Sequence, residues 1–193
     1  MERKTCLQLI YLGTSLFSWG CLAAHYNIIA CSNIVGCMCF VDFFFTERND
    51  MLAHHSFVLA LLHYMNTHQE IENRNDIVSV ALSTEISTIF LTMNNLLERS
   101  PYETLKILNK TAFVVSFMYY RIYKFAWLVA DERVHTSFLV HSKNSYEYGE
   151  IYVGLYGLFL LNVYWLFLIF KKMKKARKEE TKIKSSITIL ELK

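Results

Sequence analysis

The chain has 193 residues, of which 53% are hydrophobic, 15% aromatic and 19% charged, with one proline and a net charge of +3. Soluble domains usually carry about a quarter charged residues, so the low charged fraction and the mean hydropathy of +0.23 argue against a soluble domain. The composition also excludes a disordered chain, collagen and a secreted disulfide scaffold. Nine of the 20 lysines and arginines lie beyond residue 170, which leaves the preceding part still more apolar.

Six apolar segments come close to the about 20 residues that a helix needs to cross a bilayer. They cover residues 6–24, 28–45, 51–65, 77–97, 107–130 and 151–170. The sequence therefore predicts an all-α, polytopic membrane protein with about six transmembrane helices in one bundle. We expect three regions, namely an N-terminus with the first helix (1–30), the main transmembrane domain (31–175) and a basic tail (176–193).

Basic residues near the ends of these segments indicate the orientation, because Lys and Arg resist translocation. With the N-terminus inside, the cytoplasmic segments contain Arg3, Lys4, Arg48 and the basic run 171–178, so both termini are predicted to be cytoplasmic. Residues 6–24 also resemble a signal peptide, and cleavage near Ala24 stays open as an alternative. The basic run is either a solvated flank of the last span or a site for anionic lipid.

All cysteines fall in the first two apolar segments, at Cys6, Cys21, Cys31, Cys37 and Cys39. In such segments cysteine acts as a small hydrophobic residue, so we expect these side chains to be core residues rather than disulfide partners.

Polar side chains inside apolar spans are candidate site residues, because each costs free energy unless it is paired or hydrated. Counting depth at about 1.5 Å per residue places several of them near the cytoplasmic boundary. This layer contains Asp42, His54, His55, Asn94, Asn95 and Asn109. A carboxylate such as Asp42 can orient one imidazole and leave its other ring nitrogen as a general base. Two interfacial histidines without a chemical role are the simpler interpretation.

A second layer lies deeper in the expected bundle. Glu85 and Arg121 are each about 12 to 14 Å from the far boundary on consecutive helices. Equal depth and opposite charge predict that they approach each other, either as a static ion pair or at the wall of a cavity. Asn162, near the middle of the last span, is expected to make a hydrogen bond between helices.

Several short motifs occur in the order found in one membrane-protein family. They are Val41-Asp42-Phe43, Ala53-His54-His55, the string 83–91 around Glu85 and Thr88, the segment 109–121 with Phe113 and Phe117, and Leu161-Asn162-Val163-Tyr164-Trp165. Over about residues 30–175 they resemble the TLC domain, which is shared by ceramide synthases, translocating-chain-associated membrane proteins and small TLC-domain lipid proteins.

The resemblance implies a multi-pass helical domain, usually in the endoplasmic reticulum, that encloses a lipid-accessible cavity for an acyl chain. In ceramide synthases, paired histidines and two aspartates on the next helix carry acyl transfer from acyl-CoA to a sphingoid amine. This chain keeps His54 and His55 but has Glu85 at the first aspartate, Thr88 at the second and Thr84 at the histidine before them. The string 85–88 is closer to the small TLC-domain lipid proteins.

The sequence therefore predicts a membrane protein that binds or organises lipid, sphingolipid included, and affects membrane lipid composition. Its intramembrane polar residues are Glu85, Thr88, Asn94, Asn109, Arg121 and Asn162. The alternative is an acyltransferase of ceramide-synthase type that takes acyl-CoA as substrate. In that case His54 or His55 is the general base and Asp42 orients it. We expect a cavity that is rimmed by these three residues and open toward the cytoplasmic leaflet.

Membrane lipids are the expected partners, and we expect no nucleic-acid partner, no cofactor and no bound metal. A di-iron centre would have to collect His54 and His55 at the start of the third span and His63 and His68 near its far side, about 12 to 20 Å away. Nucleotide-binding glycine loops, cysteine-based zinc motifs and a serine nucleophile elbow do not occur. The sequence indicates no oligomeric state.

Overall fold

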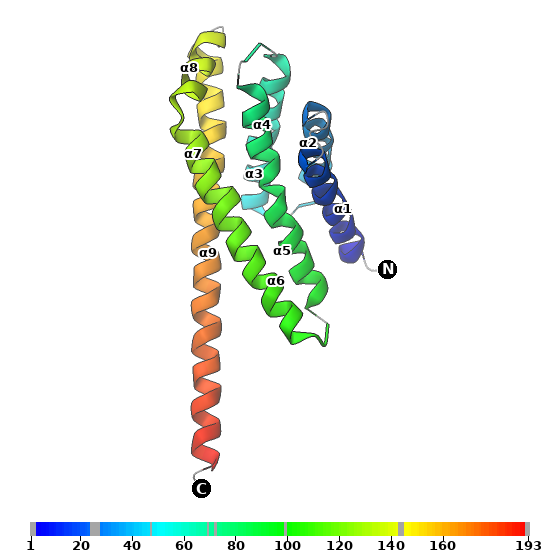
Figure 1. Ribbon diagram of the computed structural model, residues 1–193, viewed down its shortest axis with the longest axis vertical. Helices are drawn as coiled ribbons and strands as arrows, with labels where there is room; N and C mark the ends of the chain where they lie inside the picture. Colours follow the sequence, from blue (N-terminus) through cyan, green and yellow to red (C-terminus); the bar gives the residue numbers. More distant parts are fainter. Residues whose placement is uncertain are drawn as a thin grey trace.

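The computed structural model describes residues 3–191, except for 24–27, 47, 69, 72, 99 and 143–144. Within these ranges the chain contains helices and no strand, which confirms the predicted all-α fold (Figure 1). The elements are α1 (Arg3–Ala23), α2 (Ile28–Phe43), α3 (Asn49–Thr67), α4 (Arg74–Ser83), α5 (Glu85–Leu97), α6 (Glu103–Ser116), the π-helix η1 (Phe117–Lys124), α7 (Phe125–Ala130), α8 (Glu132–His141) and α9 (Ser145–Glu191).

The helices pack side by side in a bundle, with α1 and α2 at one edge and the long α9 at the other (Figure 1). α1 packs against α5, α2 and α4, while α3 lies between α2 and α9. The N-terminal end of α1, the α5–α6 connection and the C-terminus point the same way, and α8 lies at the opposite end (Figure 1). The C-terminal half of α9 extends beyond the other helices.

Every apolar segment of the sequence forms a helix at the expected place, but the number of membrane spans stays a prediction. Among the described residues, Arg74–Leu97 and Tyr146–Glu179 are long and apolar enough to cross a membrane. Leu9–Leu22 and Ile29–Phe43 are also apolar, yet each is shorter than a full span.

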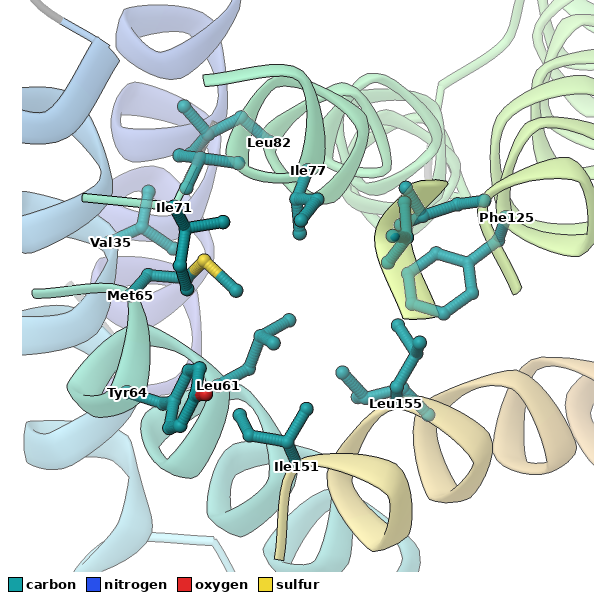
Figure 2. Close-up of a cluster of buried hydrophobic side chains, with 14 of the residues drawn as sticks. Val35, Leu61, Tyr64, Met65, Ile71, Ile77, Leu82, Phe125, Ile151 and Leu155 are labelled. Carbon is teal, nitrogen blue, oxygen red and sulfur yellow. The ribbon is translucent and has the colours of Figure 1, made fainter. Parts of the chain in front are cut away.

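The buried apolar core lies between α2, α3, α4, α7 and α9. Figure 2 shows Leu61 and Met65 of α3 facing Leu155 of α9, with Ile77 and Phe125 closing the other side. Ile77 and Leu155 are completely shielded from solvent. The core thus joins the first half of the chain to the last helix.

α8 lies between the predicted apolar segments 107–130 and 151–170, where the sequence predicts no helix. Asp131 caps the helix because its side chain accepts a hydrogen bond of 3.0 Å from the backbone amide of Arg133. Val134 and Phe138 point from this helix into the core and are buried. The cap and the burial of two apolar residues four positions apart thus fix α8 against the bundle.

A disulfide joins Cys21 near the end of α1 to Cys31 in the first turns of α2. This finding corrects the expectation that the cysteines are only small core residues. Among the cysteines with described side chains, Cys37 and Cys39 are free. The disulfide is possible because antiparallel packing of α1 and α2 brings the Cα atoms of Cys21 and Cys31 to a distance of 6.6 Å, which a disulfide can bridge.

Candidate functional site

A cavity of about 40 Å³ adjoins the apolar core, between α2, α3, α5, η1 and α9. Its polar lining consists of His54, Thr84, Glu85, Arg121 and Asn162. Leu61, Leu82 and Phe125, which Figure 2 shows in the core, continue into its apolar wall. A water molecule needs roughly 10 to 15 Å³ of such space, and ligand pockets usually offer about 300 Å³ or more. In this conformation the cavity fits a few polar atoms and not a whole acyl chain.

Two helices are irregular where they border this cavity. The helix over residues 74–97 breaks at Thr84, whose hydroxyl donates to the carbonyl oxygen of Ala81 at 2.7 Å. The helix over residues 103–130 widens into a π-helix at Phe117–Lys124, with Arg121 in that segment. Irregular backbone inside a membrane bundle is tolerated where it lines a cavity, and π-helical segments occur often at functional sites.

Arg121 is the most completely enclosed charged side chain at this site, with 5% of its surface exposed. All three guanidinium nitrogens donate to neutral oxygens: Nε to Ser87 Oγ at 2.7 Å, Nη2 to Thr88 Oγ1 at 2.9 Å and Nη1 to Asn162 Oδ1 at 3.3 Å. The guanidinium also lies 5.5 Å from the centre of the Trp165 ring. These contacts join η1 to α5 and α9.

Glu85 does not form an ion pair with Arg121, which corrects the expected direct contact. Its Oε2 accepts a hydrogen bond of 3.1 Å from Ser15 Oγ, which comes from α1. Both charged side chains nevertheless line the same cavity, which is the second of the two arrangements expected from the sequence. The depth count placed Glu85 and Arg121 at one level correctly, but it carries no information on which neighbour each faces around its helix.

The structure brings Asp42 and His55 together. Asp42 Oδ2 lies 2.8 Å from His55 Nε2, and both side chains are buried between α2 and α3. The alignment is poor for a hydrogen bond, so this close contact is an ion pair only when the imidazole is protonated. Neither Asp42 nor His55 lines the cavity.

His54 faces the cavity instead, because adjacent residues on a helix point about 100° apart. Its ring lies 5.2 Å from that of Trp165, and its buried Nδ1 has no hydrogen-bond partner in the described part of the chain. The expected grouping of Asp42, His54 and His55 around one cavity is therefore wrong for two of the three. His54 lines the space, while Asp42 and His55 pair behind it.

Trp165 connects the cavity to the first turn of α3. Its indole nitrogen donates to Asp50 Oδ2 at 2.8 Å, and Asp50 also accepts a hydrogen bond of 3.1 Å from Arg48 Nε. The hydrogen bond from Arg48 holds the pKa of Asp50 below its usual value. Asp50 is therefore ionised at neutral pH and fixes the Trp165 ring beside His54 and Arg121.

The remaining predicted polar residues form a separate contact. Asn109 Nδ2 of α6 donates to Asn94 Oδ1 at 2.8 Å and to the carbonyl oxygen of Phe90 at 2.9 Å. These bonds hold α6 to α5 and do not reach Asp42 or His55. Asn95 is exposed. The pair has the geometry of a structural contact between helices.

Sequence reasoning missed three polar partners of the site, namely Ser15, Ser87 and Trp165. A serine in an apolar helix is a weak signal, because its hydroxyl usually bonds to the preceding turn of its own backbone. Ser18, one turn after Ser15, does so by donating to the carbonyl oxygen of Thr14 at 2.9 Å. Packing of α1 on α5 distinguishes the two serines, and the sequence does not show that packing.

Comparison with known proteins assigns the chain to a family. A family model described as the TLC domain matches residues 8–171, which extends from α1 into α9. No curated protein and no solved structure matches the chain at a significant level. Since the matched range covers most of the chain, the resemblance noted in the motifs is confirmed. The chain belongs to the TLC-domain family of membrane proteins, which is related to lipids.

Proposed function

We propose that this protein binds or organises a membrane lipid at the cavity beside Arg121 and thereby affects membrane lipid composition. The observation that carries the proposal is a buried arginine, whose nitrogens donate to neutral oxygens, at a cavity that continues into the apolar core. A buried charge inside a membrane bundle is costly, so an arginine in this position is a candidate site residue. Two helices that are irregular at the same place support the same conclusion.

Binding is favoured over catalysis because the parts needed for acyl transfer are separated. His55 has a carboxylate beside it but does not line the cavity, while His54 lines the cavity without a carboxylate to orient it. Thr88, at the position where the resemblance implies an aspartate, accepts a hydrogen bond from Arg121. A general base needs both orientation and access to the reacting group.

The acyltransferase of ceramide-synthase type is the second candidate, and the Asp42–His55 contact of 2.8 Å is the observation in its favour. A large rotation of α3 about its axis would have to bring that imidazole to the cavity. Purified protein offered acyl-CoA and a long-chain amine separates the two candidates. Turnover that is abolished in His55→Ala or His54→Ala supports the enzyme, whereas co-purified lipid without turnover supports the binding protein.

For the topology we propose six spans with both termini in the cytoplasm, in the membrane of the endoplasmic reticulum. Disulfides persist in the lumen and are rare in the cytosol. The Cys21–Cys31 disulfide lies at the end of α1 opposite to the N-terminus, which favours a luminal α1–α2 connection. A glycosylation acceptor placed in residues 131–150 should be modified, and one placed after Lys178 should not. The reverse pattern would contradict the orientation.

We also propose that α1 stays in the mature protein rather than being cleaved as a signal peptide. Ser15 donates to Glu85, and Cys21 is bonded to Cys31, so α1 supplies a partner to two other helices. A cut near residue 24 would leave α1 attached through the disulfide and release it on reduction. Mass measurement before and after reduction distinguishes an intact chain from a disulfide-linked pair of fragments.

The identity of the bound lipid is the first quantity to measure. The motifs around Glu85 favour the small TLC-domain lipid proteins, and a sphingolipid is among the lipids to look for. Mass spectrometry of lipids retained by the detergent-purified protein, compared with an unrelated membrane protein purified in parallel, gives the inventory. One or a few enriched species support the proposal, and an inventory identical to that of the bulk membrane contradicts it.

A further inference from the structure

We propose that the polar end of the cavity selects a net-neutral lipid head group that presents a hydrogen-bond donor next to an acceptor, such as an alcohol beside an ester carbonyl. This inference rests on the proposed lipid-binding function and names the chemical class of the lipid. It depends on the two charges in the cavity wall, on their separation and on the small volume between them.

The first observation is the charge of the lining. Arg121 contributes a positive charge and Glu85 a negative charge, and the two do not form an ion pair. The two charges of the cavity wall therefore cancel, while the guanidinium offers hydrogen-bond donors and the carboxylate offers an acceptor at separate points of the wall. A ligand acceptor such as a carbonyl oxygen matches the guanidinium, and a ligand O–H or N–H matches the carboxylate.

The second observation is that a charged head group meets a like charge. An anion placed at Arg121 shares the cavity with Glu85, and a cation placed at Glu85 shares it with Arg121. Repulsion by the like charge offsets part of the attraction to the opposite charge, so an ionic head group gains less affinity here than it would beside one charge alone. A neutral head group with both hydrogen-bonding functions avoids either repulsion.

The third observation is size. A cavity of about 40 Å³ accepts a hydroxyl, a carbonyl or an amide, and it is too small for a phosphodiester with its substituent. Val35, Val58 and Leu158 complete the wall and offer contact to the first methylene groups of an alkyl chain. The volume therefore disfavours large zwitterionic head groups, whereas only the charges of the wall act against the simple ions.

The experiment uses Trp165 as a reporter, because its ring lies 5.5 Å from the Arg121 guanidinium. Trp19 and Trp127 lie on the outside of the bundle, with 50% and 57% of their surface exposed. Replacing both by Phe leaves Trp165 as the single tryptophan. The full-length protein in uncharged detergent is titrated with lauroyl glycerol, laurate and laurylamine, which have the same alkyl chain. At about pH 8 an ordinary imidazole is neutral and both ionic ligands stay charged.

The expected result is a saturable change in Trp165 emission with lauroyl glycerol and an affinity at least about tenfold weaker for laurate and laurylamine. Glu85→Gln keeps an acceptor for Ser15 but makes the wall positive, so preference should move to laurate. Arg121→Gln makes the wall negative, so preference should move to laurylamine. The matched controls are the exposed Glu132→Gln and Lys110→Gln, which change the net charge equally and should leave the order unchanged.

Two results overturn the inference. If the parent protein binds laurate as tightly as lauroyl glycerol, or if Glu85→Gln leaves the preference unchanged, the cavity does not select by charge. The Glu85→Gln comparison decides the matter even where Arg121→Gln fails to fold, as judged by its circular dichroism spectrum and elution volume. If none of the lipids changes Trp165 emission, the proposed lipid-binding function itself fails, which is a distinguishable outcome.

Discussion

Arg121 and Glu85 line one cavity from η1 and α5 without forming an ion pair. Each charge is instead stabilised by neutral groups, since Arg121 donates to Ser87, Thr88 and Asn162 while Glu85 accepts from Ser15. Their separation leaves both side chains able to interact with a third group. This arrangement is the physical basis of the proposed site. The contacts of Arg121 and the contact of Glu85 can therefore be tested separately.

Thr88→Val should destabilise the bundle by about 1 to 3 kcal/mol, because it leaves the Nη2 group of Arg121 without its acceptor. Thr111→Val is the matched control, since that threonine is exposed and bonds only to the carbonyl oxygen of Ile107 in its own helix. Thermal unfolding of both variants in the same detergent provides the comparison. Equal stability of the two variants would show that Thr88 does not hold the guanidinium.

Ser15→Ala should cost about 1 to 2 kcal/mol, because it removes the hydrogen bond that α1 makes to the Glu85 carboxylate. Ser18→Ala removes a hydroxyl that is equally buried but bonds only within α1, so it should cost less. The free energy of unfolding of the two variants in one denaturant series measures the difference. A larger loss for Ser18→Ala would place the Glu85 partner elsewhere.

The positions of the helices were predictable because apolar periodicity and length are recorded directly in the sequence. The same depth count correctly placed Glu85 and Arg121 at one level. It did not predict their partners, because depth along a helix says nothing about rotation around its axis. For His54 and His55, a rotation of about 100° decides which ring lines the cavity, and only the packing of α3 fixes that rotation.

Other features depend on contacts between segments and left no clear local signal. The Cys21–Cys31 disulfide requires that α1 and α2 pack antiparallel at a particular height. The helix α8 packs on the core through Val134 and Phe138, which is a contact with helices far away in the sequence. The π-helix around Arg121 likewise has no signature in residue type. These are the places where packing between segments, rather than local preference, decides the structure.

Gly157→Ala should destabilise the α3–α9 contact by about 1 to 3 kcal/mol, because the new Cβ would lie 2.7 Å from the Phe57 ring. Gly149→Ala on the same helix meets nothing within 4 Å, and it should stabilise α9 by about 0.5 to 1 kcal/mol through helix propensity. Thermal unfolding distinguishes the two substitutions. Adding Phe57→Leu to Gly157→Ala should recover part of the loss, and no recovery would contradict the close contact.

Cys21→Ser should lower the free energy of unfolding by about 2 to 3 kcal/mol, because the disulfide closes a loop with a sequence separation of 10. Cys37→Ser changes an exposed free thiol and should have little effect. A direct check is alkylation of the denatured, unreduced protein followed by mass spectrometry. Alkylated Cys21 and Cys31 in that sample would show that the disulfide does not form, and with it the luminal placement of the α1–α2 connection would lose its support.

The most direct test of lipid binding at the cavity is to fill the cavity. Ala81 lines it, so Ala81→Leu places additional carbon atoms in a space of about 40 Å³ while the surrounding helices keep their packing. Ala176→Leu, on the exposed part of α9, is the control for the change in composition. Native mass spectrometry of the purified proteins measures the fraction of molecules that carry lipid. We expect Ala81→Leu to lose most of the bound lipid and Ala176→Leu to retain it, and equal lipid occupancy in both folded variants would contradict binding at the cavity.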